Sequence, residues 1–246
     1  MTRILGLLAA TCVSLACTAS ADTPSLSKAK AAFAKADAAL NEAWSKAKAQ
    51  LPESAFNQLR DDQRAWVDYR DYLSTSPMYT GVSGSEEDLR ETAAYFDAAS
   101  SLTGSRTDWL NGLLAPLPQN GSLTGYWIDS YGGHLELVEN DGKLHFVIEV
   151  VRGPTVHLGG IAGIATWNQT IGWFSDKGRE EGKDDETNLS FTHRNNQLEV
   201  IGANTMWYHG ARAYFDGHYV RTGPLSDTQQ LRVMKAAATG EIPEGE

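Results

Sequence analysis

The spacing of apolar residues changes once along the chain, and this change constrains the fold more than any other feature of the sequence. From Ser25 to about Leu114, apolar residues recur every three or four positions, which is the spacing of one helix face. After residue 122 they alternate with polar residues, as is typical of β-strands. The segment between the two regions, APLPQNGS, has the composition of a linker, and we assign residues 116–122 to it. The sequence therefore predicts two domains of an α+β protein.

The first domain, residues 22–115, reads as three amphipathic helices. The first helix carries an apolar stripe to Leu51, and Pro52 suits the first turn of the second helix. A loop rich in Gly, Ser and Pro, SPMYTGVSGS, follows the second helix. Ser85, with Asp88 three residues later, then predicts the start of a third helix. Amphipathic helices with connections of this length predict a small antiparallel three-helix bundle.

The second domain, residues 123–224, begins with a strong hairpin signal. The sequence NDGK lies between two alternating segments, and a turn centred on its Asp-Gly dipeptide places Leu137 opposite Phe146. The same register places His134 opposite Glu149 on the other face. Further expected strands are LTGYWID, VHLGGIAGIA, TIGWF, TNLSFTH, QLEVIG and ARAYFDGHYVR. Short, regularly spaced strands of this kind predict a closed or nearly closed antiparallel β-barrel.

Three smaller expectations concern packing in this second part of the chain. The glycines of LGGIAGIA are expected to allow tight strand packing. Trp127, Trp167, Trp173 and Trp207 are expected to lie in the barrel core, and the alternative is that they form an interface or a sugar-stacking surface. Residues 225–246 are expected to form a short helix and a polar tail that adds little to the core.

The first 21 residues have the pattern of a secretory signal peptide. Arg3 precedes a short apolar run, and Ala19, Ser20 and Ala21 supply small residues for cleavage before Asp22. The run is shorter than the roughly 20 residues that a membrane-spanning helix needs. We therefore expect a soluble periplasmic or secreted protein and not an integral membrane protein. The alternative is a lipoprotein anchored at Cys17.

The composition of the remaining chain narrows its chemistry and its partners. Both cysteines, Cys12 and Cys17, lie in the signal segment, so disulfides and cysteine-ligated metals are excluded from the mature chain. Its 20 basic and 31 acidic residues give a net charge of −11. This balance argues against nucleic acid or an anionic membrane surface as partner and favours a basic one.

The apolar face of the second helix contains two polar residues, Gln63 and Arg70. If the first two helices form a hairpin around Pro52, Arg70 faces the turn that contains Asp37, and a guanidinium can bind a carboxylate through two hydrogen bonds. The polar residues expected to meet in a network that fixes the helix register are Asp37, Gln63, Arg70, Thr103 and Arg106. The alternative is a docking surface formed by Gln63, Arg64 and Arg70.

The segments ALNEAWSKAKAQL, LRDDQRAWVDYRD and LTGSRTDWL resemble the LprI-like domain of bacterial lysozyme inhibitors, over about residues 25–115. The most specific part is QRAW-x-x-YRD, residues 63–71. The positions that match the family pattern, and that are expected to be structural, are Asp37, Asn41, Gln63, Arg64, Trp66, Arg70, Thr103 and Arg106. Members commonly carry one cysteine after YRD and another on the third helix, whereas here those regions read YL and AAYFD. The barrel region is similar to a small module of exported bacterial proteins, which implies no defined activity.

The sequence contains no pattern that indicates catalysis or a cofactor. Gly-x-Ser-x-Gly and a phosphate-binding glycine loop are absent. The six histidines are separated by 11, 12, 36, 16 and 9 positions, so no close metal-binding pair exists. We therefore expect a protein that is not an enzyme and that needs no cofactor or metal. A zinc or copper carrier that uses the histidines is a third possibility.

An acidic segment, SDKGREEGKDDET, lies between two of the expected strands. Its candidate partner-binding residues are Glu180, Glu181, Asp184, Asp185 and Glu186. Lysozymes are basic around the cleft, so an acidic loop is suited to steer toward that cleft and block it. The resemblance and the charge together predict a non-catalytic lysozyme inhibitor. The alternatives are a solubilising hairpin tip and a protein that binds a small ligand or cell-wall fragment in the barrel lumen or mouth.

Overall fold

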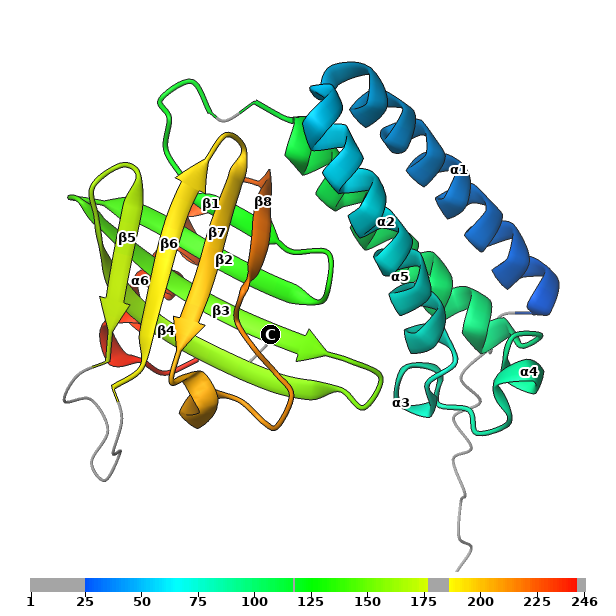
Figure 1. Cartoon of the computed structure of the whole chain (residues 1–246). Coiled ribbons are helices and arrows are strands. Elements are labelled where there is room, and N and C mark those ends of the chain that lie inside the picture. The colour runs from blue at the N-terminus through cyan, green and yellow to red at the C-terminus, as the bar shows by residue number, and fades with distance from the viewer. Residues whose placement is uncertain (1–24, 117, 177–185, 243–246) are drawn as a thin grey trace, which may run out of the picture.

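The computed structural model describes residues 25–116, 118–176 and 186–242, and it shows a helical bundle packed against a β-barrel (Figure 1). The helices of the bundle are α1 (Leu26–Gln50), α2 (Glu53–Ser74), α3 (Pro77–Thr80), α4 (Glu86–Leu89) and α5 (Ala93–Leu114). The predicted α+β class, with helices first and an antiparallel barrel second, is confirmed. The expected signal segment lies outside the described residues.

The three long helices of the bundle are α1, α2 and α5, and α1 packs most closely along α5. Buried alanines on both helices, Ala47 and Ala99 among them, permit this close approach because they carry no long side chain. Phe33 of α1 contacts Phe96 of α5, with 5.9 Å between the ring centroids. Near the α1–α2 turn, the rings of Trp44 and Phe56 lie 4.9 Å apart.

The third predicted helix is interrupted in the structure. Ser85 caps a helix as predicted, since its Oγ accepts a hydrogen bond from the Asp88 amide at 3.2 Å, but that helix is only the single turn α4. The chain then leaves helical geometry, and the Thr92 hydroxyl caps α5 by accepting from the Tyr95 amide at 3.2 Å. Two capping residues seven positions apart thus divide one apolar pattern into two helices.

The β-strands form a closed antiparallel barrel in chain order. They are β1 (Gly125–Ile128), β2 (Gly133–Asn140), β3 (Lys143–Arg152), β4 (His157–Trp167), β5 (Ile171–Ser175), β6 (Asn188–Arg194), β7 (Gln197–Ala203) and β8 (Gly217–Gly223). The predicted hairpin register is confirmed, with Leu137 opposite Phe146 and His134 opposite Glu149. Residues 211–216 were expected in the last strand but precede it, because they cross the end of the barrel and bury Phe215 in its core.

The interior of the barrel is filled by apolar side chains. Leu135, Leu137, Phe146 and Phe191 are fully buried there, and Trp127 lies among them. The LGGIAGIA glycines do serve close packing, since a Cβ at Gly163 would overlap the Phe174 ring. Among the described residues, the barrel interior is therefore a packed apolar core.

The prediction that four tryptophans lie in the core is wrong for two of them. Trp127 and Trp167 are buried, but Trp173 is 52% exposed and Trp207 is 55% exposed. Trp173 points outward because its neighbours Gly172 and Phe174 occupy the inward positions of β5. Trp207 lies in η1 (Thr205–Tyr208), a short 3₁₀ helix outside the strands.

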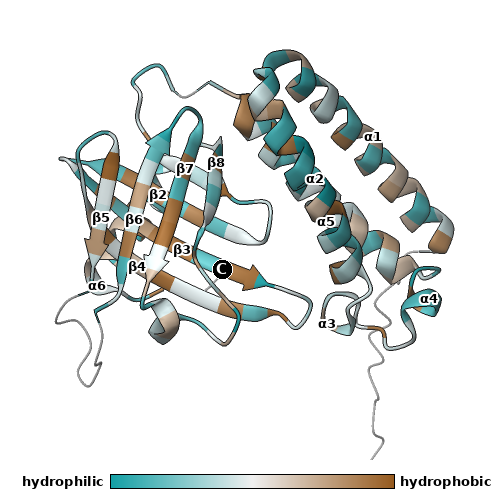
Figure 2. Ribbon diagram, viewed as in Figure 1, coloured by the Kyte–Doolittle hydropathy of each residue, from teal (hydrophilic) through white to brown (hydrophobic). Residues whose placement is uncertain are grey.

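Two helical elements cover the outside of the barrel. The bundle covers β8, and a Cβ at Gly112 of α5 would lie 2.8 Å from a methyl carbon of Val220, so only glycine permits this approach. Helix α6 (Asp227–Thr239) packs on β2, β3 and β4, with Val233 buried against Val138 and Val147. The hydropathy colouring shows that the strands carry apolar residues among polar ones (Figure 2). The expectation that residues 225–246 add little to the core is therefore wrong, because α6 buries Val233 against the barrel.

Replacing Val233 by alanine tests the contribution of α6. The Val233 side chain is fully buried, so Val233→Ala should lower the free energy of unfolding by about 2 kcal/mol. Leu231→Ala on the same helix is the matched control, because Leu231 is 69% exposed, and it should change stability by less than about 0.5 kcal/mol. Urea denaturation measures both; equal effects would show that α6 does not pack on the barrel in solution.

Candidate functional site

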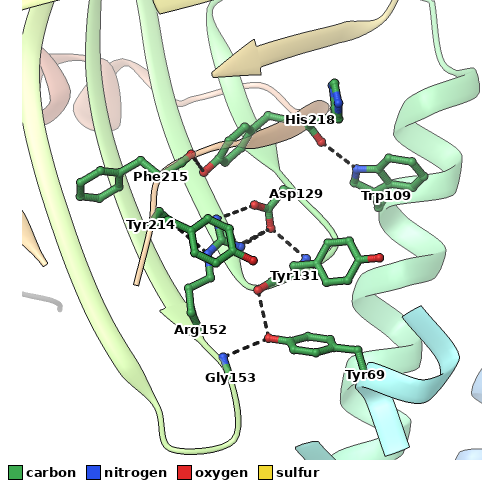
Figure 3. Close-up of polar contacts among 11 residues, drawn as sticks. Tyr69, Trp109, Asp129, Tyr131, Arg152, Gly153, Tyr214, Phe215 and His218 are labelled. Atoms are coloured by element: carbon green, nitrogen blue, oxygen red, sulfur yellow. Dashed lines mark hydrogen bonds and ion pairs between the residues drawn. The ribbon is translucent and has the colours of Figure 1, made fainter. Parts of the chain in front are cut away.

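The turn between β1 and β2 joins the barrel to the bundle. Trp66 of α2 donates its indole N–H to the Ser130 carbonyl at 3.1 Å, and the Tyr69 hydroxyl donates to the Tyr131 carbonyl at 3.3 Å. On α5, the indole N–H of Trp109 donates to the His218 carbonyl at 3.1 Å (Figure 3). Three aromatic side chains of the bundle thus satisfy backbone carbonyls of the barrel, which a loosely attached domain would leave to water.

Arg106 is the charged centre of this junction, and its side chain is fully buried. Its Nε donates to Gln63 Oε1 at 2.9 Å, and its Nη2 donates to Asp62 Oδ2 at 2.6 Å. Its Nη1 donates to Ser130 Oγ of the barrel at 2.6 Å. Burial lowers the pKa of Arg106 and the Asp62 carboxylate opposes that shift, but a guanidinium stays charged at any physiological pH. Gln63 and Arg106 therefore meet as expected. Arg106 also binds Ser130, so the network extends into the barrel.

Asp62 links Arg106 to the aromatic residues of the turn. Its second oxygen accepts a hydrogen bond from the Tyr131 hydroxyl at 2.8 Å. Burial raises the pKa of the Tyr131 phenol, and the neighbouring Asp62 carboxylate raises it further, so Tyr131 remains a donor. The guanidinium of Arg106 also lies 4.5 Å from the Trp109 ring centroid, a cation–π contact.

The expected ion pair between Arg70 and Asp37 is not formed. Arg70 does face Phe33, with the guanidinium carbon 5.2 Å from its ring centroid, so the predicted hairpin alignment holds. Asp37 instead accepts a hydrogen bond from Asn41, one helical turn further along α1, at 3.0 Å. Its half-exposed carboxylate is satisfied on its own helix, and Arg70 packs over aromatic rings.

Two further motif positions lie outside the Arg106 network. Thr103 is fully buried, but its hydroxyl has no hydrogen-bond partner among the described residues. Arg64 points to solvent, where it pairs with Asp61 at 3.3 Å. The QRAW-x-x-YRD motif therefore divides into two sets: Gln63, Trp66 and Tyr69 serve the junction with the barrel, and Arg64 and Arg70 do not.

A second buried arginine lies at the barrel end that faces the bundle. Arg152 and Asp129 are 2% and 3% exposed, and they form a bidentate pair with Nη1 to Oδ1 at 3.0 Å and Nη2 to Oδ2 at 2.7 Å (Figure 3). Arg152 Nε also donates to the Tyr214 carbonyl at 3.1 Å. Burial lowers the pKa of Arg152, but the Asp129 carboxylate outweighs this effect and the net shift is upward.

The sequence contains a signal for this pair that motif reasoning missed. Asp129 follows Trp127 by two positions, and Arg152 follows Ile148 and Val150 by steps of two. A strand period of two therefore extends the inward-facing rows to both charged residues. An inward charge in a filled barrel needs a partner, so two opposite charges on these rows indicate a buried ion pair.

Two cavities lie between the bundle and the barrel. The larger has a volume of about 920 Å³ and is bordered by α2, α5, the β6–β7 turn and the segment before β8. Its lining includes Gln58, Asp62, Trp109, Gln197, Tyr214 and His218. The smaller, of about 450 Å³, is lined by tyrosines that include Tyr69, Tyr126 and Tyr131. The larger cleft is the candidate functional site, in place of the barrel lumen that the sequence led us to consider.

The described histidines and carboxylates do not gather as a metal site. Across the three ranges that the structure describes, no group of three or more His, Cys, Asp or Glu side chains has the arrangement that would hold an ion. Three histidines have a hydroxyl within hydrogen-bond distance instead. These contacts join His134 to Tyr126, His157 to Thr155, and His209 to Thr205.

Most of the predicted acidic contact segment falls outside the described residues. This is the case for Glu180, Glu181, Asp184 and Asp185. Glu186 is described; it is exposed beside the end of β5 and accepts a hydrogen bond from the Ser175 hydroxyl. The described flanks of the acidic segment, Ser175 and Glu186, thus lie at the end of β5 and shortly before β6.

Comparison with known protein families finds a match in the helical part of the chain. Residues 17–110 match the family described as Lysozyme inhibitor LprI, in agreement with the resemblance found in the sequence. No curated protein and no solved structure matches the chain. Within the described ranges, no helix combines the length and the apolar character needed to cross a membrane.

Truncating Arg106 tests its role at the junction. Arg106→Ala leaves Gln63, Asp62 and Ser130 without a shared donor and should lower the free energy of unfolding by about 3 kcal/mol. The control is Arg64→Ala, which removes only an exposed pair and should cost less than about 0.5 kcal/mol. Chemical denaturation followed by tryptophan fluorescence measures both, and a small loss for Arg106→Ala would contradict the assignment.

The pH dependence of stability tests the contacts of Asp71. Burial raises the pKa of Asp71, but hydrogen bonds from Tyr95 and Arg90 lower it more, so it lies below its ordinary value. A carboxyl group whose pKa is lower in the folded state than in the unfolded state stabilises the fold at any pH above its unfolded pKa. This stabilisation is lost as the pH falls through the folded pKa.

The stability difference between the wild type and Asp71→Asn should therefore be largest near about pH 7 and shrink below about pH 4. Urea denaturation across this pH range provides the measurement. Asp61→Asn, whose carboxylate is 70% exposed, is the control and should show a small difference throughout. A pH-independent difference for Asp71→Asn would rule out the stabilising role of the charge.

Proposed function

We propose that the protein is an exported inhibitor of lysozyme-type muramidases that binds the enzyme one to one without turnover. The observation that carries this proposal is the match of residues 17–110 to the lysozyme inhibitor family LprI. Export is supported by the signal pattern of residues 1–21, which predicts release into the periplasm or the medium. The proposed partner is therefore an enzyme that the protein would meet at the cell wall.

Charge supports a basic partner. The chain without its signal segment carries a net charge of −11, and a lysozyme is strongly basic around its cleft. Opposite net charges speed the diffusional encounter of two proteins and orient them before contact. This attraction weakens as salt screens it, with a Debye length of about 8 Å at physiological ionic strength.

The proposed contact region is the end of the barrel that carries the acidic segment. Its acidic residues are Glu180, Glu181, Asp184, Asp185 and Glu186. Trp173 on β5 and Ile201 on β7 lie on the outer barrel wall nearby, both opposite Ser190 of the intervening strand. Both side chains are at least half exposed, and exposed tryptophans beside charged residues are frequent anchors of protein interfaces.

A lysis assay tests the proposal. Residues 22–246 would be titrated against hen-type and goose-type lysozymes acting on bacterial walls, at about 10 mM and about 150 mM salt. We expect saturable inhibition near a one-to-one ratio that weakens at the higher salt concentration. Full lysis by both enzymes in the presence of excess protein would reject the proposed function.

Charge neutralisation locates the contact. The variant Asp184→Asn/Asp185→Asn/Glu186→Gln should slow association with lysozyme by about tenfold at low salt. The matched control, Glu86→Gln/Glu87→Gln/Asp88→Asn, removes three consecutive exposed acidic residues from α4 and should have a much smaller effect. If both variants slow association equally, the net charge of the protein drives the encounter, and residues 184–186 have no special role in it.

A further inference from the structure

We propose that the cleft between the bundle and the barrel binds a neutral oligosaccharide, with the Tyr214 ring as its stacking platform. The volume of about 920 Å³ falls in the range typical of small-molecule sites. Its walls come from both domains, with Gln58 on α2, Gln197 at the start of β7 and His218 on β8. This proposal goes beyond lysozyme inhibition and does not depend on it.

The Tyr214 ring packs against Arg152, and the residue is still partly exposed. The Arg152 guanidinium carbon lies 4.4 Å from the ring centroid, and Arg152 is itself held by Asp129 (Figure 3). Tyr214 nevertheless lines the cleft and is 45% exposed. A pyranose presents a face of C–H groups that packs well on an aromatic ring, and a ring already held in place loses little entropy when it does so.

Further hydrogen-bonding side chains line the same cleft as Tyr214. The side chains of Gln58, Gln197 and His218 line the cleft and make no hydrogen bond within the described residues. Amide groups both donate and accept hydrogen bonds and an imidazole nitrogen also forms them, which matches the hydroxyl and acetamido groups of a sugar. Groups of this kind remain solvated until a ligand with matching donors and acceptors replaces the water.

The charges of the cleft favour a neutral ligand over a charged one. Three carboxylates line it, two of them are paired with an arginine, and Asp216 has no such partner among the described residues, so the remaining negative charge disfavours an anionic ligand. Each is already engaged, with Asp62 bonded to Arg106, Asp129 bonded to Arg152, and Asp216 accepting from the Gly202 amide at 3.2 Å. A cationic ligand would therefore have to compete with existing partners, whereas hydroxyl groups can share the remaining lone pairs.

Calorimetric titration with tetra-N-acetylchitotetraose, in the absence of any lysozyme, tests the proposal. We expect saturable one-to-one binding to residues 22–246. Tyr214→Ala should weaken it about tenfold, whereas Tyr214→Phe should retain it because the ring is kept. Trp207→Ala removes an exposed aromatic side chain outside the cleft and should have no effect. Because lysozyme is absent, failure here is distinct from failure of the inhibitor proposal.

A second pair of variants avoids any effect on folding. Tyr214 covers Arg152, so its removal can disturb the barrel, but Gln58 is exposed on α2. Gln58→Ala should weaken binding by about threefold to tenfold, and Gln50→Ala, an exposed glutamine of α1, should not. Absence of saturable binding of tetra-N-acetylchitotetraose would overturn the proposal. So would a wild-type affinity for it in both Tyr214→Ala and Gln58→Ala. Tighter binding of an anionic oligogalacturonate than of the neutral sugar would also contradict it.

Discussion

The guanidinium of Arg106 is buried where α2, α5 and the β1–β2 turn of the barrel meet, and each of its donor nitrogens has a partner. Two partners, Gln63 and Asp62, come from α2, and the third, Ser130, comes from the barrel. Leaving a buried guanidinium unpaired costs several kcal/mol, so these three elements keep fixed positions relative to one another. The glutamine on the apolar face of α2 is explained by this requirement, because it lies where the arginine needs a neutral acceptor.

A second buried arginine extends the same principle into the barrel. Arg152 closes the barrel end with Asp129 and holds the ring of Tyr214, while Arg106 holds the ring of Trp109. Both rings line the larger cleft. The cleft is therefore bordered by aromatic side chains whose positions are set from behind by paired charges, which is a preorganised arrangement for ligand binding. The residues proposed to contact lysozyme are others, in the sequence between β5 and β6.

The regular part of the fold could be predicted from the sequence, because hydrophobic period and turn chemistry are local. The period of two placed Leu137 opposite Phe146, and the inward row continues to Arg152. The period of two indicates that Asp129 and Arg152 both point inward, but the geometry of their pairing depends on how the closed barrel brings the end of β1 near the end of β3. The prediction of an Arg70–Asp37 pair was wrong for a related reason. The helical period indicates which face of a helix a residue lies on, but it does not indicate which helix packs there. Helix α1 packs most closely on α5, and Asp37 accepts its hydrogen bond from Asn41 of its own helix. The spacing of Val233, Ala236 and Ala237 in α6 was a local signal of a buried face.

The central claim is that motif side chains of the helical domain hold the barrel in a fixed position, so that both domains form one structural unit with a cleft between them. Differential scanning calorimetry of residues 22–246 tests this most directly. One cooperative transition, with equal calorimetric and van't Hoff enthalpies, is the predicted result. Two separate transitions, one for the bundle and one for the barrel, would contradict the claim, because the Arg106 contacts would then contribute too little to couple the domains.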